Sequence, residues 1–228
     1  MIPSISGLQA RPEGHEKATQ QVRFEDMKHT YTQGLLMVIS APSGAGKTTV
    51  CKRLLAEFPD LHFSVSCTTR PPRAGERDGT DYRFISVADF NNRRTMGEFV
   101  EWEEIYGSYY GTSKRDIEAI LQQGSDIVLD IDTNGARNVK AIYPEAVLIF
   151  ILPPSVAILK ERLTKRGSET NAVIKRRFDK AMKEIRENEW YDYVVFNDII
   201  EDCVTILRSV YIAEKNRRSR VQGKIDDF

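Results

Sequence analysis

The sequence predicts an α/β protein in which a parallel sheet is flanked by helices. Short, almost wholly apolar runs alternate along the chain with segments of helical periodicity, as expected when every strand is covered on both faces. The first of these runs, residues 35–40, leads directly into SAPSGAGKTT at residues 40–49, a turn of small residues followed by a helical segment. Strand, tight turn and helix in that order bring backbone N–H groups and a helix N-terminus to one edge of the sheet.

The same alternation continues from residue 35 to near the end of the sequence. Residues 66–113 are less regular, which predicts a small mixed α/β insertion of short strands and turns. Residues 1–32 hold few apolar side chains and several prolines and glycines, which predicts a flexible extension. The organised domain is expected at residues 33–216, with a tail at 217–228. Expected strands cover residues 35–40, 63–69, 126–132, 146–154 and 191–198, and expected helices cover residues 47–58, 113–124, 133–143, 155–167, 171–190 and 200–220.

Composition excludes several classes of protein. The 228 residues include 33 Lys and Arg against 33 Asp and Glu, so no overall basic field favours nucleic-acid binding, and any anion site must be local. No apolar stretch approaches the roughly 20 residues of a membrane span. The three cysteines, Cys51, Cys67 and Cys203, are an odd number without CxxC spacing, which favours free thiols in a reducing compartment. A cytoplasmic protein without nucleic-acid or membrane partners is expected.

The turn after the first strand matches a phosphate-binding loop and predicts the P-loop NTPase fold. Residues 41–48 fit G-x-x-x-x-G-K-[ST] except that Ala41 replaces the first glycine. Lys47 adds a point charge for a polyphosphate, and the Thr48 hydroxyl can ligate Mg²⁺. ATP is the expected donor nucleotide. The expected ATP-binding residues of this loop are Ala41, Pro42, Ser43, Gly44, Ala45, Gly46, Lys47, Thr48 and Thr49.

A second anion site is indicated by SCTTRPPRAGERDGTDYRF, which begins at Ser66. Arg70 and Arg73 flank a rigid Pro-Pro pair, an arrangement suited to fixing two guanidinium groups on one small anion. Tyr82 and Tyr110 add hydroxyl donors. Solvated surface arginines and rim aromatics of a small sheet are the alternative interpretation of the same residues.

The order of the P-loop, SCTTRPPRAGERDGTDYRF, FVEWEEIYGSYYGTS and VLDIDTNGARNVK resembles guanylate kinase of the bacterial type over residues 34–213. The resemblance implies a nucleoside monophosphate kinase that transfers the γ-phosphate of ATP to GMP, giving ADP and GDP, with Mg²⁺ as cofactor. Guanine presents N–H donors on the edge where adenine has an acceptor, so an ionised carboxylate accepts from guanine and repels adenine. By resemblance, the GMP phosphate is held by Ser66, Arg70, Arg73, Tyr82 and Tyr110, and the base by Glu101, Thr112 and Asp132.

The resemblance also implies a helical lid over residues 160–178 and an adenine contact at Asn197. Asp130 is expected at the C-terminal end of a strand beside the P-loop strand, where α/β sheets form their ligand crevice, and could reach Mg²⁺ through a water molecule. A helix cap or a salt-bridge partner is the alternative for Asp130. Because the lid and the insertion are distant in the sequence, both segments are expected to swing toward the P-loop. The expected catalytic residues are Lys47, Asp130, Arg162, Arg166 and Arg177.

Two other classes of function remain open. A guanylate-kinase-like module could bind phosphopeptides without catalysis, but the retained Gly44, Gly46, Lys47 and lid arginines favour an enzyme. A P-loop kinase with another nucleoside monophosphate acceptor, or an RNA-binding NTPase that uses the basic run KNRRSR, is the second alternative. The carboxylates expected around the base favour guanine, and a basic cluster at a helix end commonly complements the helix dipole.

Overall fold

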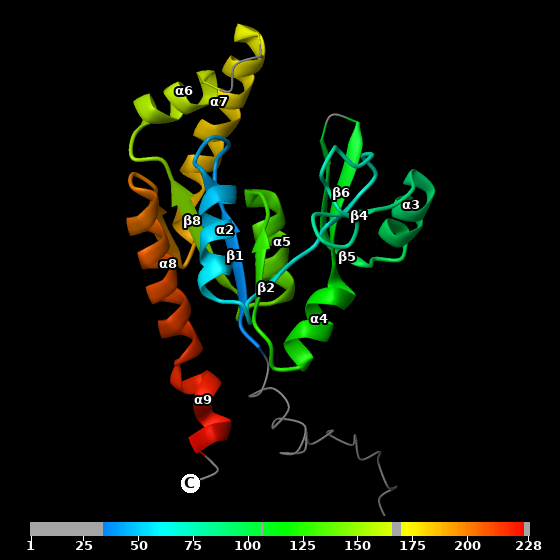
Figure 1. Ribbon diagram of the computed structural model, residues 1–228, viewed down its shortest axis with the longest axis vertical. Coiled ribbons are helices and arrows are strands. Elements are labelled where there is room, and N and C mark those ends of the chain that lie inside the picture. Colours follow the sequence, from blue (N-terminus) through cyan, green and yellow to red (C-terminus); the bar gives the residue numbers. More distant parts are fainter. Residues whose placement is uncertain (1–33, 106, 166–169, 226–228) are drawn as a thin grey trace, which may run out of the picture.

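A computed structural model describes residues 34–105, 107–165 and 170–225 and confirms the predicted α/β class. Its main sheet has the order β2-β7-β1-β8-β9, and every pair of neighbouring strands in it is parallel. Figure 1 shows this sheet between helices, with a second, smaller sheet standing to one side. The strands of the main sheet are β1 (Leu36–Ser40), β2 (His62–Phe63), β7 (Ile127–Asp130), β8 (Val147–Leu152) and β9 (Tyr193–Phe196).

Helices cover both faces of the main sheet. Alternate residues of β1 point to opposite sides, so Met37 and Ile39 pack with one set of helices and Leu36 and Val38 with the other. The first set is α2 and α8, and the second is α4 and α5. The helices are α2 (Lys47–Glu57), α3 (Val87–Thr95), α4 (Lys114–Gln122), α5 (Thr133–Ile142), α6 (Val156–Thr164), α7 (Asn171–Arg186), α8 (Ile200–Lys215) and α9 (Arg218–Ile225).

The small sheet belongs to the insertion predicted at residues 66–113. Its order is β4-β3-β6-β5, with β3 and β4 parallel and the other two pairs antiparallel. Helix α3 joins β4 to β5, and Phe90 of α3 stacks on Phe99 of the sheet with ring centroids 4.6 Å apart. The strands are β3 (Cys67–Thr68), β4 (Arg83–Phe84), β5 (Phe99–Ile105) and β6 (Ser108–Ser113).

The structure corrects several expected element boundaries. The single strand expected at residues 63–69 is two strands in different sheets, because the chain leaves β2 and enters the small sheet as β3. The helix expected at residues 200–220 stops at Lys215, and part of the expected tail forms α9. Helix α7 ends at Arg186 and is followed by a short 3-10 turn, Asn188–Trp190. The extension expected at residues 1–32 lies outside the described residues.

Two expectations from composition can be compared with the described part of the chain. No helix within it is long and apolar enough to cross a membrane. Cys51, Cys67 and Cys203 are free and buried. Burial raises the pKa of the Cys203 thiol to about 11, so this sulfur stays protonated at neutral pH.

Asp126 links the start of β1 to the end of α8 through hydrogen bonds and an ion pair. Its Oδ1 accepts from the backbone N–H of Leu35 at 2.7 Å, and its Oδ2 lies 2.7 Å from both the Tyr211 hydroxyl and Lys215 Nζ. Burial alone would raise the pKa of Asp126, but the hydrogen bonds from Lys215, Tyr211 and Leu35 outweigh burial and hold the pKa below its usual value. Ionised Asp126 therefore stabilises the fold.

Replacing Asp126 by Ala is expected to lower the free energy of unfolding by about 2–3 kcal/mol at pH 7, because two buried donors lose their acceptor. A depressed pKa contributes stability above the ordinary Asp value near 3.9 and loses it as the pH falls through the folded-state pKa. In urea titrations the stability difference between the two proteins should therefore start to shrink below about pH 4 and continue to shrink as the pH falls through the folded-state pKa. Asp60→Ala, at an exposed position, is the control. A gap between Asp126→Ala and the parent that stays constant from pH 7 to pH 3 would contradict the role of the charge.

Candidate active site

The phosphate-binding loop leaves β1 at Ser40 and enters α2 at Lys47, as the sequence predicts. The Ala45 N–H bonds the Pro42 carbonyl at 3.1 Å, which closes the turn. Ala41, which stands where the motif has its first glycine, is buried. Thr48 and Thr49 are exposed in the first turn of α2.

Two glycines of this loop are required by both backbone and packing. Gly44 and Gly46 have φ of 93° and 90°, in the left-handed region that side chains disfavour. A Cβ on Gly46 would lie 2.5 Å from Asn197 Nδ2, and one on Gly44 would lie 3.1 Å from a methyl of Leu163. The loop can therefore follow this path only with glycine at these positions.

Lys47 is anchored on the neighbouring strand. Its Nζ lies 2.5 Å from Asp130 Oδ1 and donates to the Ile131 carbonyl at 2.7 Å. Asp130 ends β7, which pairs with β1 through Ile39 opposite Asp130. Asp130 therefore lies where it was expected, at the end of a strand beside the P-loop strand. It also forms a salt bridge, which was the alternative interpretation of this residue.

The residues at this edge fit a magnesium ion bound together with phosphate. Magnesium prefers hard oxygen ligands and keeps several waters. The Thr48 hydroxyl is exposed beside Lys47, and the Asp130 carboxylate is on the same edge of the sheet.

Two of the expected lid arginines already contact the phosphate-binding loop. Arg162 of α6 donates to the Asn197 carbonyl at 3.1 Å and to the Ala45 carbonyl at 3.4 Å. Arg177 of α7 donates to Ser43 Oγ at 2.9 Å. In this structure, carbonyl and hydroxyl oxygens of the protein hold these two guanidinium groups against the loop. The expected swing of the lid toward the loop when substrates bind stays a prediction. Arg166 lies outside the described residues.

Asn197 lies beneath the loop at the end of β9. It is 2% exposed, and its Nδ2 donates to the Ala45 carbonyl at 2.7 Å. Its Oδ1 is buried and has no hydrogen-bond partner in the described part of the chain. A cavity of about 330 Å³ adjoins it, lined also by Thr49, Arg162, Lys165 and Ile200. Asn197 therefore lines a cavity beside the phosphate-binding loop and holds a buried acceptor without a partner in the described residues.

The second expected anion site gathers on the small sheet. The Arg70 guanidinium lies over the Tyr82 ring, 5.4 Å from its centroid, and its Nε donates to the Tyr110 hydroxyl at 3.3 Å. Glu76, which sequence reasoning missed, accepts two hydrogen bonds from Arg70 at 2.9 Å and one from the backbone N–H of Arg73 at 2.7 Å. Its position three residues after Arg73, within RPPRAGE, was the available signal. These hydrogen bonds hold the pKa of Glu76 below its usual value.

The expected base pocket forms where β5 meets the start of α5. Glu101 accepts a short hydrogen bond from the buried Thr112 hydroxyl, whose oxygen lies 3.4 Å from Ser66 Oγ. Burial, reinforced by the negative charge of Asp132, raises the pKa of Glu101 to about 7. Asp132 caps α5 by accepting from the Gly135 N–H at 2.8 Å, while its Oδ2 is buried without a partner among residues 34–105, 107–165 and 170–225.

Gly135 makes this approach of acidic groups possible. A Cβ at Gly135 would lie 3.1 Å from Glu101 Cγ and 3.2 Å from Glu101 Oε2. Sequence reasoning did not single out this glycine. It also missed Lys180 of α7, whose Nζ lies 3.3 Å from Glu103 on β5 and 3.7 Å from the buried Glu184. Lys180 thus joins α7, the helix that also carries Arg177, to the strand that carries Glu101.

The loop, its lysine and a second cluster of arginine, tyrosine and carboxylate groups on a separate small sheet define a P-loop protein of the kinase class. The chain belongs to the guanylate kinase family, because the family model described as guanylate kinase matches residues 33–214.

Similar proteins agree with this assignment. The chain is 52% identical over 189 residues to the guanylate kinase of Geobacter metallireducens, covering 83% of this chain and 93% of the relative. It is 49% identical over 188 residues to that of Symbiobacterium thermophilum, covering 82% of this chain and 89% of the relative. The crystal structure of guanylate kinase from Anaplasma phagocytophilum superposes with a TM-score of 0.67 at 31% identity, covering 83% of this chain and 90% of that one.

Gly46→Ala is expected to damage catalysis more than folding. An alanine forced into the left-handed region costs about 1–3 kcal/mol. Displacement of Asn197 by the new Cβ should move the loop and lower the rate of phosphate transfer by about a hundredfold. Gly223→Ala, in α9 with nothing within 4 Å of the new Cβ, is the matched control and should leave activity unchanged. Steady-state rates and thermal melts report both effects. Equal activity of the two variants would show that the loop tolerates a side chain at Gly46.

Proposed function

We propose that the protein transfers the γ-phosphate of ATP to GMP and releases ADP and GDP. The observation that carries the acceptor assignment is the pair of carboxylates in the base pocket: Glu101, held by Thr112, and Asp132, whose Oδ2 is buried without a partner in the described chain. Guanine offers N1–H and the N2 amine on one edge, and two carboxylate acceptors match those donors. Adenine has an acceptor on that edge and would leave the carboxylates unsatisfied.

Each substrate has its own set of residues in this proposal. The ATP phosphates lie on the N–H groups of the loop, close to Lys47, Arg162 and Arg177, and Arg166 completes the lid. Adenine occupies the cavity beside Asn197, whose free Oδ1 accepts from the adenine amine. Residues 41–49 form the ATP site. The GMP phosphate is held by Ser66, Arg70, Arg73, Tyr82 and Tyr110.

Catalysis follows from position and charge, because phosphoryl transfer has little covalent chemistry for a protein to perform. Arg70 is held by Glu76 and Tyr110, so its guanidinium is oriented before the acceptor binds. Lys47 is held by Asp130 and must turn from that carboxylate toward the β- and γ-phosphates. Thr48 would hold Mg²⁺, with Asp130 reaching it through water, and the ion supplies charge neutralisation of the phosphates. The acceptor phosphate is already ionised, so the chain needs no general base.

Lys47→Ala is expected to lower the rate by about three orders of magnitude, since a preorganised charge on the transferred phosphate is lost. Lys52→Ala, exposed on the same helix, is the matched control and should keep full activity. ADP release should be assayed with GMP, AMP, CMP and UMP in turn. Activity confined to GMP supports the acceptor assignment, whereas faster turnover of another nucleotide contradicts it. No turnover with any acceptor, together with phosphopeptide binding, would indicate a non-catalytic module.

GMP binding is expected to strengthen as the pH rises from 6 to 8. The folded-state pKa of Glu101 is raised to about 7, so its carboxyl is mostly protonated at pH 6 and ionised at pH 8. Only the ionised form accepts from both guanine donors. The Kd for GMP should therefore fall up to about tenfold per pH unit below the pKa.

Glu101→Gln separates the contribution of this carboxyl from other causes of pH dependence. Any pH dependence of GMP binding that remains in the variant comes from the second ionisation of the GMP phosphate near pH 6. The variant should bind GMP about 2–4 kcal/mol more weakly, since an amide presents donors to the donors of guanine. Calorimetric titration at pH 6, 7 and 8 measures both. Identical pH profiles for the variant and the parent would show that Glu101 does not contact the base.

A further inference from the structure

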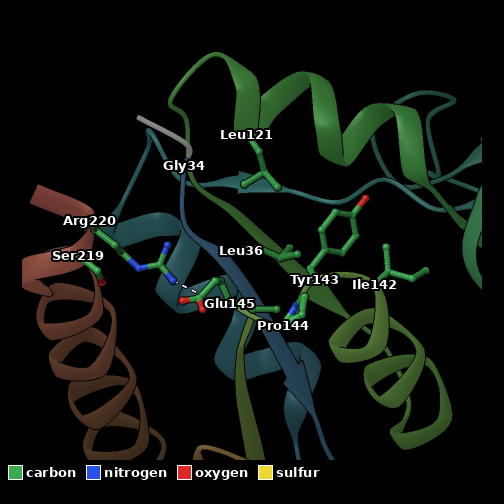
Figure 2. Close-up of a pocket in the computed structure, with 10 residues that line it drawn as sticks. Gly34, Leu36, Leu121, Ile142, Tyr143, Pro144, Glu145, Ser219 and Arg220 are labelled. Atoms are coloured by element: carbon green, nitrogen blue, oxygen red, sulfur yellow. Dashed lines mark hydrogen bonds between the residues drawn. The ribbon is translucent and has the colours of Figure 1, made fainter. Parts of the chain in front are cut away.

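A second cavity lies at the opposite end of the main sheet from the phosphate-binding loop. Its volume is about 480 Å³, within the range of binding sites for small ligands or buried side chains. Figure 2 shows Leu121 of α4, Leu36 of β1 and Ile142 of α5 around it, with Arg220 of α9 on the far wall. None of these residues belongs to the site proposed for ATP and GMP.

The cavity is lined by apolar side chains and by one arginine, a combination that suits a ligand with an apolar part and an acidic group. Its apolar lining includes Leu36, Leu121, Ile142 and Pro144, and Ile142 is 43% exposed. Arg220 Nη2 donates to the Glu145 carbonyl at 3.0 Å, the contact dashed in Figure 2. The Nε of the same guanidinium is buried and has no hydrogen-bond partner within the described residues. A buried N–H of a charged group favours an anionic acceptor.

Helix α9, which lies outside the family match, lines this cavity, and so does the first described residue of the chain. The match covers residues 33–214, so α9, which supplies Ser219 and Arg220, lies beyond it. Gly34, the first described residue after the 33 that precede it, also lines the cavity. The N-terminal segment is therefore tethered to the cavity itself.

That segment contains a sequence with the required chemistry. Residues 22–26 read VRFED, in which the aromatic Phe24 is followed directly by two acidic residues, Glu25 and Asp26. Phe24 precedes Gly34 by ten positions in the sequence. A random-coil chain of that length spans roughly 17 Å on average, so Phe24 can reach the cavity.

We propose that residues 22–26 dock in this cavity, with the Phe24 ring on its apolar floor and the carboxylate of Glu25 or Asp26 on Arg220 Nε. The N-terminal extension then serves as an intramolecular strap that covers the end of the sheet remote from catalysis. Tethering gives the segment an effective concentration of about a millimolar or more, so weak intrinsic affinity is enough to keep it bound.

Hydrogen exchange of the full chain tests the docking. Phe24→Ser should make amides of residues 142–146 and 219–223 exchange about tenfold faster, the factor expected when a site filled tenfold above its Kd becomes empty. Leu8→Ser, a similar truncation elsewhere in the extension, is the matched control and should leave exchange unchanged. GMP phosphorylation should stay at the parent rate in both variants, which shows that the domain is intact. Unchanged exchange in Phe24→Ser would overturn the proposal.

A disulfide test distinguishes the possible occupants. With Phe24→Cys and Ile142→Cys combined, mild oxidation should give a crosslinked monomer, while Leu8→Cys with Ile142→Cys should crosslink far more slowly. The three native thiols are buried and should not compete. Three results would overturn the proposal: equal crosslinking from both positions, crosslinked dimers that indicate a second copy, or a tightly bound small molecule found by native mass spectrometry.

Discussion

The contact between Lys47 and Asp130 depends on the main sheet and fixes the geometry of the rest of the site. The parallel register of β1 and β7 sets Ile39 opposite Asp130, and the left-handed turn at Gly46 then points the lysine across to the neighbouring strand. The next residue, Ile131, accepts from Lys47 through its carbonyl. The one after, Asp132, caps α5, and its negative charge acts on Glu101. Three consecutive residues thus connect the proposed site of the donor phosphates to the proposed site of the base. Movement of this strand end would disturb both.

Charge is separated along the crevice. Arginines and Lys47 gather where phosphates are proposed to lie, while carboxylates gather where the base is proposed to lie. Among the described residues, Arg70 forms an ion pair with Glu76, and Glu103, on the strand that carries Glu101, forms an ion pair with Lys180. Each cluster therefore carries an internal counter-ion before any substrate enters. Such counter-ions let like charges be concentrated without the full cost of repulsion. They also explain how a chain with equal numbers of acidic and basic residues can hold two strongly polarised sites.

The sequence was most informative where local chemistry determines the structure. The phosphate-binding loop, the alternation of strands and helices and the placement of Asp130 at a strand end were all predictable, because glycine spacing and apolar runs act over a few residues. Contacts between side chains from distant segments were not predictable. Nothing local showed that Lys180 would reach Glu103, or that one apolar run would divide between two sheets as β2 and β3. Asp132 was expected at the base, but its second role as the cap of α5 depends on where the helix begins. The identities of the bound ligands stay predictions.

The central position of β1 in the sheet affects how the protein must be made. This strand is completely buried, and both of its neighbours come much later in the chain; Leu35 and its partner Asp126 are 91 residues apart. At about 5–20 residues per second, a ribosome needs roughly 5–20 seconds to deliver the first neighbouring strand after β1 emerges. During that interval five consecutive residues, Leu36–Ser40, with unpaired backbone groups, are open to association with other nascent chains. The same order of strands that places the lysine beside its carboxylate therefore makes translation speed, and any chaperone that shields the emerging strand, part of the conditions for a correctly assembled sheet.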